Sequence, residues 1–339
     1  ITCDFSSSPS LSHLIVVGNT ATRGGGIYCD NNSNPSLVNI TIKDNTTTSF
    51  GYAGGIFCSG GSSPSLENVL IKNNTTSGNG GGIMHTGYSN MSLEDVTITG
   101  NSSNEGGGIW INDSNTSFDN VTITGNTANS NGGGIYLFGS ATLNDITITD
   151  NVSSQIGGGI YIHSGNNTLV NSCLIKDNQG YLGGGIGYYN STSSIIQNST
   201  IISNTMDYDG GLSGNRGGSG IYLDNTNIEI TNCTIANNSF SNSGTGGVYG
   251  MRSVGLNITN SIVWGNSGSY QFYFGSDGND AAAIVVNNIC SQGSEYLDTG
   301  YDIVPAYGFG VMNSGVLYET DPIGANNINS TPDFVDAAN

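Results

Sequence analysis

The chain has 339 residues and a formal net charge of −19, built from 25 acidic and only 6 basic side chains. A nucleic-acid-binding protein needs a basic stripe to neutralise phosphates, so this balance argues against nucleic acid as a partner. It disfavours an anionic membrane surface for the same reason. No apolar run approaches the roughly 20 residues of a membrane-spanning helix, so we expect no membrane span in this chain.

A short phrase that ends in asparagine recurs along most of the chain, as in "ITIKDN", "VTITGN" and "CLIKDN". The spacing between successive terminal asparagines is 25 to 29 residues, with one interval of 34. A fixed period in this range is typical of a solenoid. The ten terminal residues are Asn19, Asn45, Asn74, Asn101, Asn126, Asn151, Asn178, Asn204, Asn238 and Asn266.

Each period holds up to three short strand segments, which in the second repeat are "GIYC", "PSLVN" and "ITIK" in chain order. Val, Ile and Thr dominate these segments, and Gly- and Asn-rich turns separate them. Three strands per turn predict an all-β parallel β-helix of about ten coils. With coils about 4.8 Å apart, ten coils make a rod on the order of 50 Å long.

Alternation within the strands predicts which side chains face the core. In "ITI" phrases the two flanking residues point inward, as Ile40 and Ile42 do, and the central threonine points outward. In "GIYC" we expect Ile27 and Cys29 inside and Tyr28 outside. A third inward column contains Leu11, Leu37, Leu66, Leu93, Phe118, Leu143, Val170, Ile196, Ile230 and Ile258.

Asparagine and cysteine also fall into columns. The terminal asparagines predict a ladder of stacked amides that bond along the rod. Cys3, Cys29 and Cys58 occupy equivalent positions in three successive coils, where parallel Cβ vectors disfavour a disulfide. Cys173 and Cys233 share a column but lie two coils apart. We interpret the cysteines as small apolar core residues.

The phrase G-G-G-I-Y followed by (N/D)-(V/I)-T-I-x-x-N resembles the right-handed parallel β-helix proteins of bacterial surfaces. The likeness is to polymorphic outer-membrane-protein repeats and to secreted choice-of-anchor β-helix proteins, and it covers residues 1 to about 266. It implies a right-handed, single-stranded β-helix and an extracellular or cell-surface location. The closing "STPDFVDAAN" resembles the end segment of those secreted proteins.

Two regions depart from the period. Residues 206–220 form an insertion within the 34-residue interval, and its Asp207, Asp209 and Arg216 are candidates for a functional loop, because loops on a regular scaffold often carry binding sites. After residue 266 the period fails, and residues 267–339 are predicted to form a C-terminal β cap with strands at "QFYF", "AAAIVV" and "GFGVM". The predicted domains are therefore 1–266 and 267–339.

Enzymatic activity is not expected. Related β-helices include pectate lyases and polygalacturonases, but the Asn-Thr-Asp, Asp-Asp, His-Gly and Arg-Ile-Lys motifs of the latter are absent. His13, His85 and His163 lie in different coils, and no cofactor or metal motif occurs. A polysaccharide lyase or hydrolase remains an alternative function.

Two outward columns are candidate surfaces. A threonine grid, Thr97, Thr122 and Thr147 beside Thr99, Thr124 and Thr149, resembles that of ice-binding solenoids, although lysines interrupt it in other coils. An aromatic column is a candidate contact surface for glycan or for a neighbouring subunit. It contains Tyr28, Phe57, Trp110, Tyr136, Tyr161, Tyr222 and Tyr249.

The leading hypothesis is a non-enzymatic extracellular rod that assembles end to end into a filament or surface coat. The chain begins at the repeat position held by Ile27 in the next coil, so the first coil is expected to present open strand edges that recruit another copy. A glycan-binding adhesin and an ice-binding protein are the other non-enzymatic alternatives. Candidate N-glycosylation sites are Asn31, Asn90, Asn112, Asn166 and Asn190.

Overall fold

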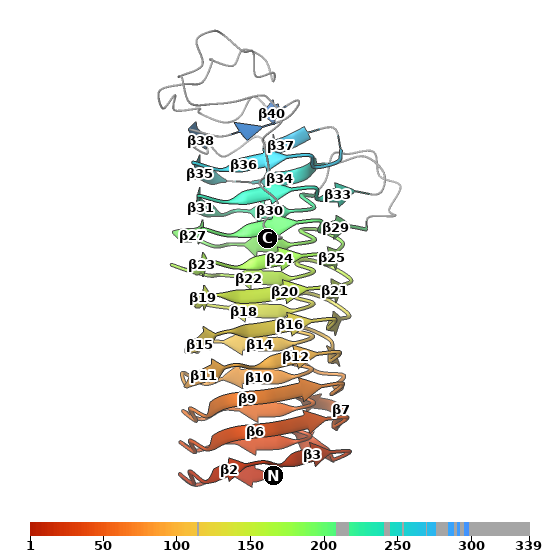
Figure 1. The fold of residues 1–339 in the computed structure, drawn as a ribbon, viewed down its shortest axis with the longest axis vertical. Helices are drawn as coiled ribbons and strands as arrows, with labels where there is room; N and C mark the ends of the chain where they lie inside the picture. Colours follow the sequence, from red (N-terminus) through yellow and green to blue (C-terminus); the bar gives the residue numbers. More distant parts are fainter. Residues whose placement is uncertain are drawn as a thin grey trace, which may run out of the picture.

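The computed structural model is a rod of stacked parallel strands without helices among the residues that it describes (Figure 1). These residues are 1–113, 115–207, 217–240, 245–252, 254–268, 270–275, 284–287, 290–291 and 295–297. Every strand pair in this part of the chain is parallel, and partners are separated by one period of the sequence. The predicted all-β parallel β-helix is confirmed.

Sheet A has 12 strands and contains the residues that follow each glycine run. Its strands are β1 (Thr2–Cys3), β5 (Ile27–Cys29), β8 (Ile56–Cys58), β10 (Ile83–Thr86), β14 (Ile109–Asn112), β18 (Ile135–Phe138), β22 (Ile160–His163), β26 (Ile186–Tyr189), β30 (Ile221–Asp224), β34 (Thr245–Met251), β37 (Tyr270–Gly275) and β40 (Glu295–Leu297).

Sheet B has 14 strands and contains the phrases that lead to the terminal asparagines. Its strands are β2 (Ser10–Ser12), β3 (Ile15–Val17), β6 (Ser36–Lys43), β9 (Ser65–Lys72), β11 (Asn90–Glu94), β12 (Thr97–Thr99), β15 (Asn115–Asp119), β16 (Val121–Thr124), β20 (Ile146–Thr149), β24 (Leu174–Lys176), β28 (Thr200–Ile202), β32 (Thr234–Ala236), β36 (Ile262–Trp264) and β39 (Cys290–Ser291).

Two six-stranded sheets complete the later coils, and a two-stranded sheet lies in the first coils. Sheet C follows the terminal asparagines with β13 (Ser102–Ser103), β17 (Thr127–Ala128), β21 (Val152–Ser153), β25 (Gln179–Gly180), β29 (Thr205–Met206) and β33 (Ser239–Phe240). Sheet D lies between sheets A and B in the chain, with β19 (Thr142–Asn144), β23 (Leu169–Asn171), β27 (Ser194–Gln197), β31 (Asn227–Thr231), β35 (Gly255–Thr259) and β38 (Ile284–Asn287). The two-stranded sheet pairs β4 (Thr20–Arg23) with β7 (Thr46–Tyr52).

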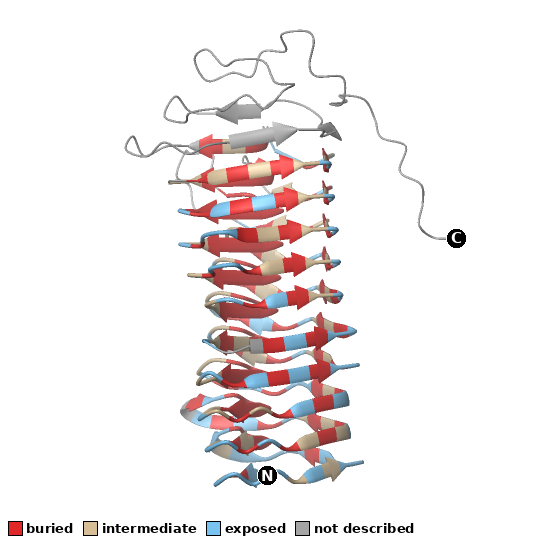
Figure 2. Cartoon of the chain, turned by 90° about the vertical axis from the view of Figure 1, so that its left-hand side faces the viewer, coloured by how far each residue is buried: buried red, intermediate tan, exposed pale blue. Residues whose placement is uncertain are grey.

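One hydrophobic core runs the length of the rod between the sheets (Figure 2). The residues that alternation places inside are buried, among them Ile40, Ile42, Leu37 and Ile196. Leu11, in the first coil, is only partly buried. Because each inner side chain packs on its counterpart in the next coil, few apolar residues suffice for a continuous core.

The terminal asparagines form the predicted ladder inside the rod. The Asn126 Nδ2 donates to Asn151 Oδ1 at 3.0 Å and to the Ile98 carbonyl at 3.0 Å. The same pattern repeats from Asn45 to Asn238, all of which are buried. Each amide therefore satisfies the carbonyl of a sheet B strand residue in the preceding coil and also ties one coil to the next.

Asn120 and Asp145 each directly precede a sheet B strand, and both adopt a left-handed backbone conformation that the sequence pattern did not reveal. Asn120 has φ of 50° and Asp145 of 54°, in the left-handed region that Asn and Asp tolerate better than other non-glycine residues. At Asp145 this conformation turns the chain from β19 of sheet D into β20 of sheet B, and at Asn120 it joins β15 to β16 within sheet B.

The glycine runs lie where neighbouring coils come closest. A Cβ built on Gly108 would sit 2.6 Å from the Gly134 carbonyl oxygen of the next coil, and Gly106 adopts φ of +63°. The glycine run therefore forms a tight corner without room for Cβ. It is no phosphate-binding loop, because a strand and not a helix follows it.

Part of the predicted C-terminal cap belongs to the same stack. "QFYF" lies in β37 and "AAAIVV" overlaps β38, and these strands extend sheets A and D. "GFGVM" lies outside the described residues. The domain boundary at residue 266 stays a prediction.

Candidate functional site

The outer face of sheet A carries the densest set of aromatic and ionisable side chains in the described part of the rod. Its four-residue strands place their first and third residues in the core, as in Ile160 and Ile162 of β22. The second and fourth residues, Tyr161 and His163, point to the other side. Two columns therefore run along this face.

The second-position column is the predicted aromatic column, and its predicted exposure is wrong. Phe57, Tyr136, Tyr161, Tyr222 and Tyr249 are all buried, and only Tyr28 and Trp110 are half-buried. The rings stack on one another, as Trp110 and Tyr136 do with centroids 5.6 Å apart.

The segment that returns to each glycine run covers this column. Ala53 forms a small second core with Phe57 and Met84, and the Ile156 side chain lies 2.2 Å from where a Cβ on Gly187 would be. Buried rings of this kind stabilise the sheet rather than offer a free surface. The sequence pattern could not show this, because the covering residues follow no regular motif.

The fourth-position column is the one that reaches solvent. Phe138, His163, Tyr189 and Asp224 are register partners on four adjacent strands. The His163 ring contacts Phe138 at 5.1 Å and Tyr189 at 5.2 Å between centroids, both edge to face. The Tyr136 hydroxyl lies 3.3 Å from His163 Nδ1. Phe138, His163 and Tyr189 are half-buried.

The ion pair between Asp224 and Arg252 lies at the C-terminal end of this column. The Arg252 Nε donates to Asp224 Oδ1 at 2.6 Å, and its Nη2 bonds Asp224 Oδ2, which makes the contact bidentate. Asp224 also accepts a hydrogen bond from the Tyr222 hydroxyl at 3.3 Å. The guanidinium lies over the Tyr189 ring, 5.5 Å from its centroid. We call Phe138, His163, Tyr189 and Arg252 the sheet A strip.

Apart from the Asp224–Arg252 ion pair, burial keeps the tyrosines Tyr136, Tyr161 and Tyr222 and the histidine His163 of this face uncharged at neutral pH. Desolvation raises the pKa of Tyr136, Tyr161 and Tyr222 well above the usual range of a phenol. It also lowers the pKa of His163, an effect that nearby Glu105 partly opposes. The tyrosines are therefore hydrogen-bond donors rather than phenolate bases, and His163 is a neutral imidazole.

The repeat pattern of the sequence does not group the residues of the sheet A strip. The repeat pattern places His163 in a coil of its own and assigns no role to Tyr189, Asp224 or Arg252. The fourth position of the sheet A strands, counted from the isoleucine after each glycine run, finds Phe138, His163, Tyr189 and Asp224, whereas Arg252 follows the fourth position of β34.

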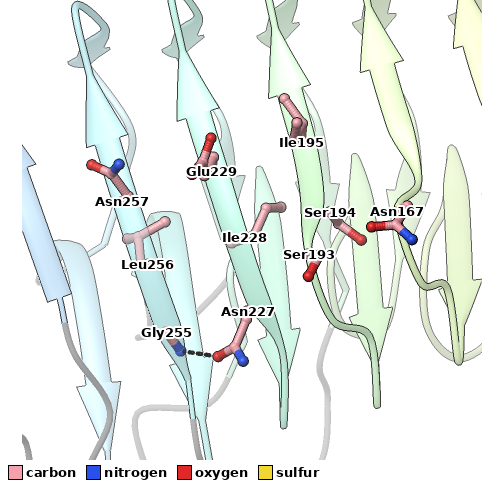
Figure 3. A pocket seen from close by; sticks show the side chains of 10 residues that line it. All are labelled: Asn167, Ser193, Ser194, Ile195, Asn227, Ile228, Glu229, Gly255, Leu256 and Asn257. Atoms are coloured by element: carbon pink, nitrogen blue, oxygen red, sulfur yellow. Dashed lines mark hydrogen bonds between the residues drawn. The ribbon is translucent and has the colours of Figure 1, made fainter.

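A groove lies where β27, β31 and β35 begin (Figure 3). This groove has a volume of about 510 Å³. Ile195, Ile228 and Leu256 provide apolar lining, and the remainder is polar: Asn167, Ser193, Ser194, Asn227, Glu229, Gly255 and Asn257. The groove has neither an aromatic ring nor a cation among its lining residues, so it is the weaker candidate for a binding site.

The other predicted site residues are dispersed. Asp207 is exposed and accepts a hydrogen bond from Gln179 Nε2 at 2.9 Å, whereas Asp209 and Arg216 lie outside the described residues. Four candidate glycosylation sites are exposed: Asn31, Asn90, Asn166 and Asn190. Asn112 is half-buried.

The threonine grid is real but short. Thr97, Thr122 and Thr147 are in register on sheet B. Leu70 precedes them and Leu174 follows them in the same column. Lys43, Lys72 and Lys176 also lie on sheet B, away from the sheet A strip. Ice binding stays a prediction.

Neither a metal cluster nor a membrane helix is found in the part of the chain that the structure describes. No group of three or more His, Cys, Asp or Glu side chains has metal-binding geometry there. No helix among these residues is long and apolar enough to cross a membrane.

Solved structures share the fold at low identity. The periplasmic alginate epimerase AlgG superposes with a TM-score of 0.55 at 10% identity, over 82% of this chain and 69% of that chain. Tailspike protein 2 of the Escherichia coli O157:H7 bacteriophage CAB120 gives 0.40 at 13%, over 95% of this chain and 42% of its own. The A-module of the Azotobacter vinelandii mannuronan C-5 epimerase AlgE6 gives 0.38 at 15%, over 88% and 90%.

Sequence comparisons agree on the fold without adding an activity. No curated protein matches significantly. The family model for the right-handed β-helix region matches residues 16–156 and 108–290, which together span most of the chain. The stacked parallel sheets and this match show that the chain belongs to the right-handed parallel β-helix family.

Proposed function

We propose that this protein is a non-enzymatic extracellular rod that binds polysaccharide along the sheet A strip. The observation that carries the proposal is the half-buried series Phe138, His163 and Tyr189, which repeats one ring per coil. Rings spaced by the coil repeat of about 4.8 Å suit a polymer of sugar units. Aromatic rings supply contact area at low entropic cost, and their polar groups bond hydroxyls.

Arg252 adds a fixed hydrogen-bond donor to this surface. Asp224 occupies one side of the Arg252 guanidinium, and the Arg252 side chain is still 39% exposed. An arginine has five N–H donors, so several remain for a ligand. Because the Asp224 contact and the Tyr189 ring hold the side chain in place, little conformational entropy is lost on binding.

The charges favour a neutral polysaccharide. Arg252 is already neutralised by Asp224, and His163 is uncharged at neutral pH. The chain as a whole carries −19, so a polyanionic glycan would be repelled over the length of the rod. A neutral chain of hydroxyl-bearing units avoids this cost.

Binding fits this surface better than catalysis. Proton abstraction from a sugar needs a base that is deprotonated at the working pH. The neutral base of the strip is His163, and its Nδ1 is already within 3.3 Å of the Tyr136 hydroxyl. The cation Arg252 is held by a carboxylate, and the sheet B lysines lie elsewhere. The alginate epimerase likeness concerns the fold, and an epimerase or lyase activity is therefore the alternative that the experiment must test.

The test is binding of neutral polysaccharides by isothermal calorimetry and by a glycan array. Tyr189→Ala and Arg252→Gln should each weaken binding at least about tenfold, the equivalent of about 1.4 kcal/mol. Tyr88→Ala is the matched control, since Tyr88 is 84% exposed and outside the strip. Loss with the control, unchanged binding in both strip variants, or turnover of the polysaccharide would contradict the proposal.

The rod itself is the scaffold for this surface. Continuous ladders and a buried amide column suit a stiff support, and the resemblance to bacterial surface proteins supports the proposal that it lies outside the cell. End-to-end stacking into a filament or coat is the accompanying proposal. Electron microscopy of concentrated protein tests it, and images of monomers alone would count against the filament.

A further inference from the structure

We propose that Cys29, together with Cys3 and Cys58, binds a soft monovalent metal ion of the Cu(I) and Ag(I) class between sulfur atoms of adjacent coils. This inference is independent of the polysaccharide surface. It concerns the inner face of sheet A, at the N-terminal end of the rod.

The three thiols form a column in register. Cys3 pairs with Cys29 and Cys29 with Cys58 as direct partners on β1, β5 and β8. All three are reduced and at most 1% exposed. Cys29 is the middle thiol of the column, with a cysteine in the coil on each side of it. Cys29 can therefore share an ion with either side.

The spacing suits an ion better than a disulfide. Parallel Cβ vectors on adjacent coils keep equivalent atoms about 4.8 Å apart. A disulfide needs Cβ atoms at roughly 3.5–4.5 Å and sulfur atoms at about 2.05 Å, so the coils would have to tilt together. Two metal–sulfur bonds of roughly 2.3 Å in line span about 4.6 Å, which the stacked coils supply without movement.

The charge of the ion follows from the apolar surroundings. Burial raises the pKa of Cys3 to about 11 and that of Cys58 well above its usual value, so these two thiols are neutral before binding. One monovalent ion that binds one thiolate and one thiol displaces a single proton to solvent, and the buried product is neutral. A divalent zinc ion would need about four ligands, and no such cluster exists among the described residues. Soft sulfur ligands select Cu(I) and similar ions.

The column continues to His85, but that side chain is already engaged. Its register partner is Cys58. Its Nδ1 lies 2.9 Å from Thr116 Oγ1 and its Nε2 lies 2.7 Å from Ser89 Oγ. We therefore assign the site to the sulfur atoms alone.

The experiment is an Ag(I) titration in chloride-free buffer, with uptake read by native mass spectrometry and stability by thermal unfolding. A Cys290→Ser background removes the one thiol whose side chain is not described. Samples are equilibrated for hours, because access to the core requires local opening. We expect one tightly bound ion per chain and a raised Tm.

Two variants and a control make the result specific. Cys29→Ala should abolish uptake, and so should the double variant Cys3→Ala/Cys58→Ala, which retains Cys29 without a neighbour. Cys173→Ala should leave uptake unchanged, because Ser199 separates Cys173 from Cys233 in the intervening coil. Uptake that survives in either variant, no uptake by the parent, or a mass loss of two hydrogens that reveals a disulfide would overturn the proposal.

Discussion

The Asp224 carboxylate is almost fully buried beneath the guanidinium of Arg252, which itself reaches solvent from the following coil. Asp224 lies at the end of β30 and Arg252 just after β34, with side-chain exposures of 4% and 39%. The pair ties two coils together on the outer face of sheet A. It also positions the only cation of the sheet A strip over Tyr189.

Removing Arg252 should destabilise the rod as well as weaken polysaccharide binding. Arg252→Ala leaves a buried carboxylate without its cation, and we expect a loss of about 2 kcal/mol, below the usual cost for a fully buried pair because the arginine is partly exposed. Urea unfolding at pH 7 measures it. Asp224→Asn in the same chain should restore most of the loss, and an additive double variant would disprove the coupling.

His85 should make folding stability depend on pH. Its ring is fully buried, and desolvation lowers its pKa from 6.5 to about 4. The unfolded chain therefore binds a proton between these values that the folded chain does not, so stability is complete above about pH 6.5 and falls as the pH drops to 4. The shift corresponds to about 3 kcal/mol.

The check for His85 is the difference in unfolding free energy between pH 7 and pH 4. His85→Leu should reduce that difference by about 3 kcal/mol, whatever its own baseline stability. The comparison cancels the carboxylates, which titrate equally in both proteins. Identical pH profiles for the two proteins would show that His85 has another protonation state.

The asparagine ladder should be the most sensitive polar feature of the core. Asn126→Ala removes the hydrogen bonds to Asn151 and to the Ile98 carbonyl. It also leaves the backbone N–H of Asn101 without its acceptor. Each buried group left without a partner costs about 1–3 kcal/mol, so we expect a total near 4 kcal/mol.

Asn129→Ala is the control for the ladder, since Asn129 lies three residues after Asn126 and is exposed. It should change stability by less than about 0.5 kcal/mol. Chemical denaturation of both variants measures the difference. Equal effects would mean that the buried amides contribute no more than surface ones.

Substitutions at two glycines distinguish the cost of steric crowding between coils from the cost of a left-handed backbone conformation. Gly108→Ala would place Cβ 2.6 Å from a backbone oxygen of the next coil, so the coils must move apart, and we expect a loss of several kcal/mol or failure to fold. Gly125 has φ of +64° and nothing closer than 4.0 Å to its added Cβ.

Gly125→Ala should therefore cost only about 1 kcal/mol, the strain of the left-handed conformation. Thermal unfolding of the two variants gives the comparison. A smaller effect at Gly108 than at Gly125 would show that adjacent coils have room that the structure does not display.

The sequence by itself determined the fold, because the hydrophobic pattern and the polar columns repeat with one period. Spacing alone placed Ile40 in the core, Asn126 in the ladder and Cys29 next to Cys58 of the adjacent coil, because every coil follows the same path and stacks on the preceding coil. It also located the glycine-rich turns that separate the strands of each coil.

Only the tertiary structure decided which outward residues meet solvent. Tyr161 and His163 are both outward in the strand pattern, yet the first is buried and the second is half-exposed. The difference comes from the irregular segments that lie over the second-position column, and their path is set by packing rather than by period. The contact between Asp224 and Arg252 has the same origin, because it joins two coils through side chains that no repeat position specifies.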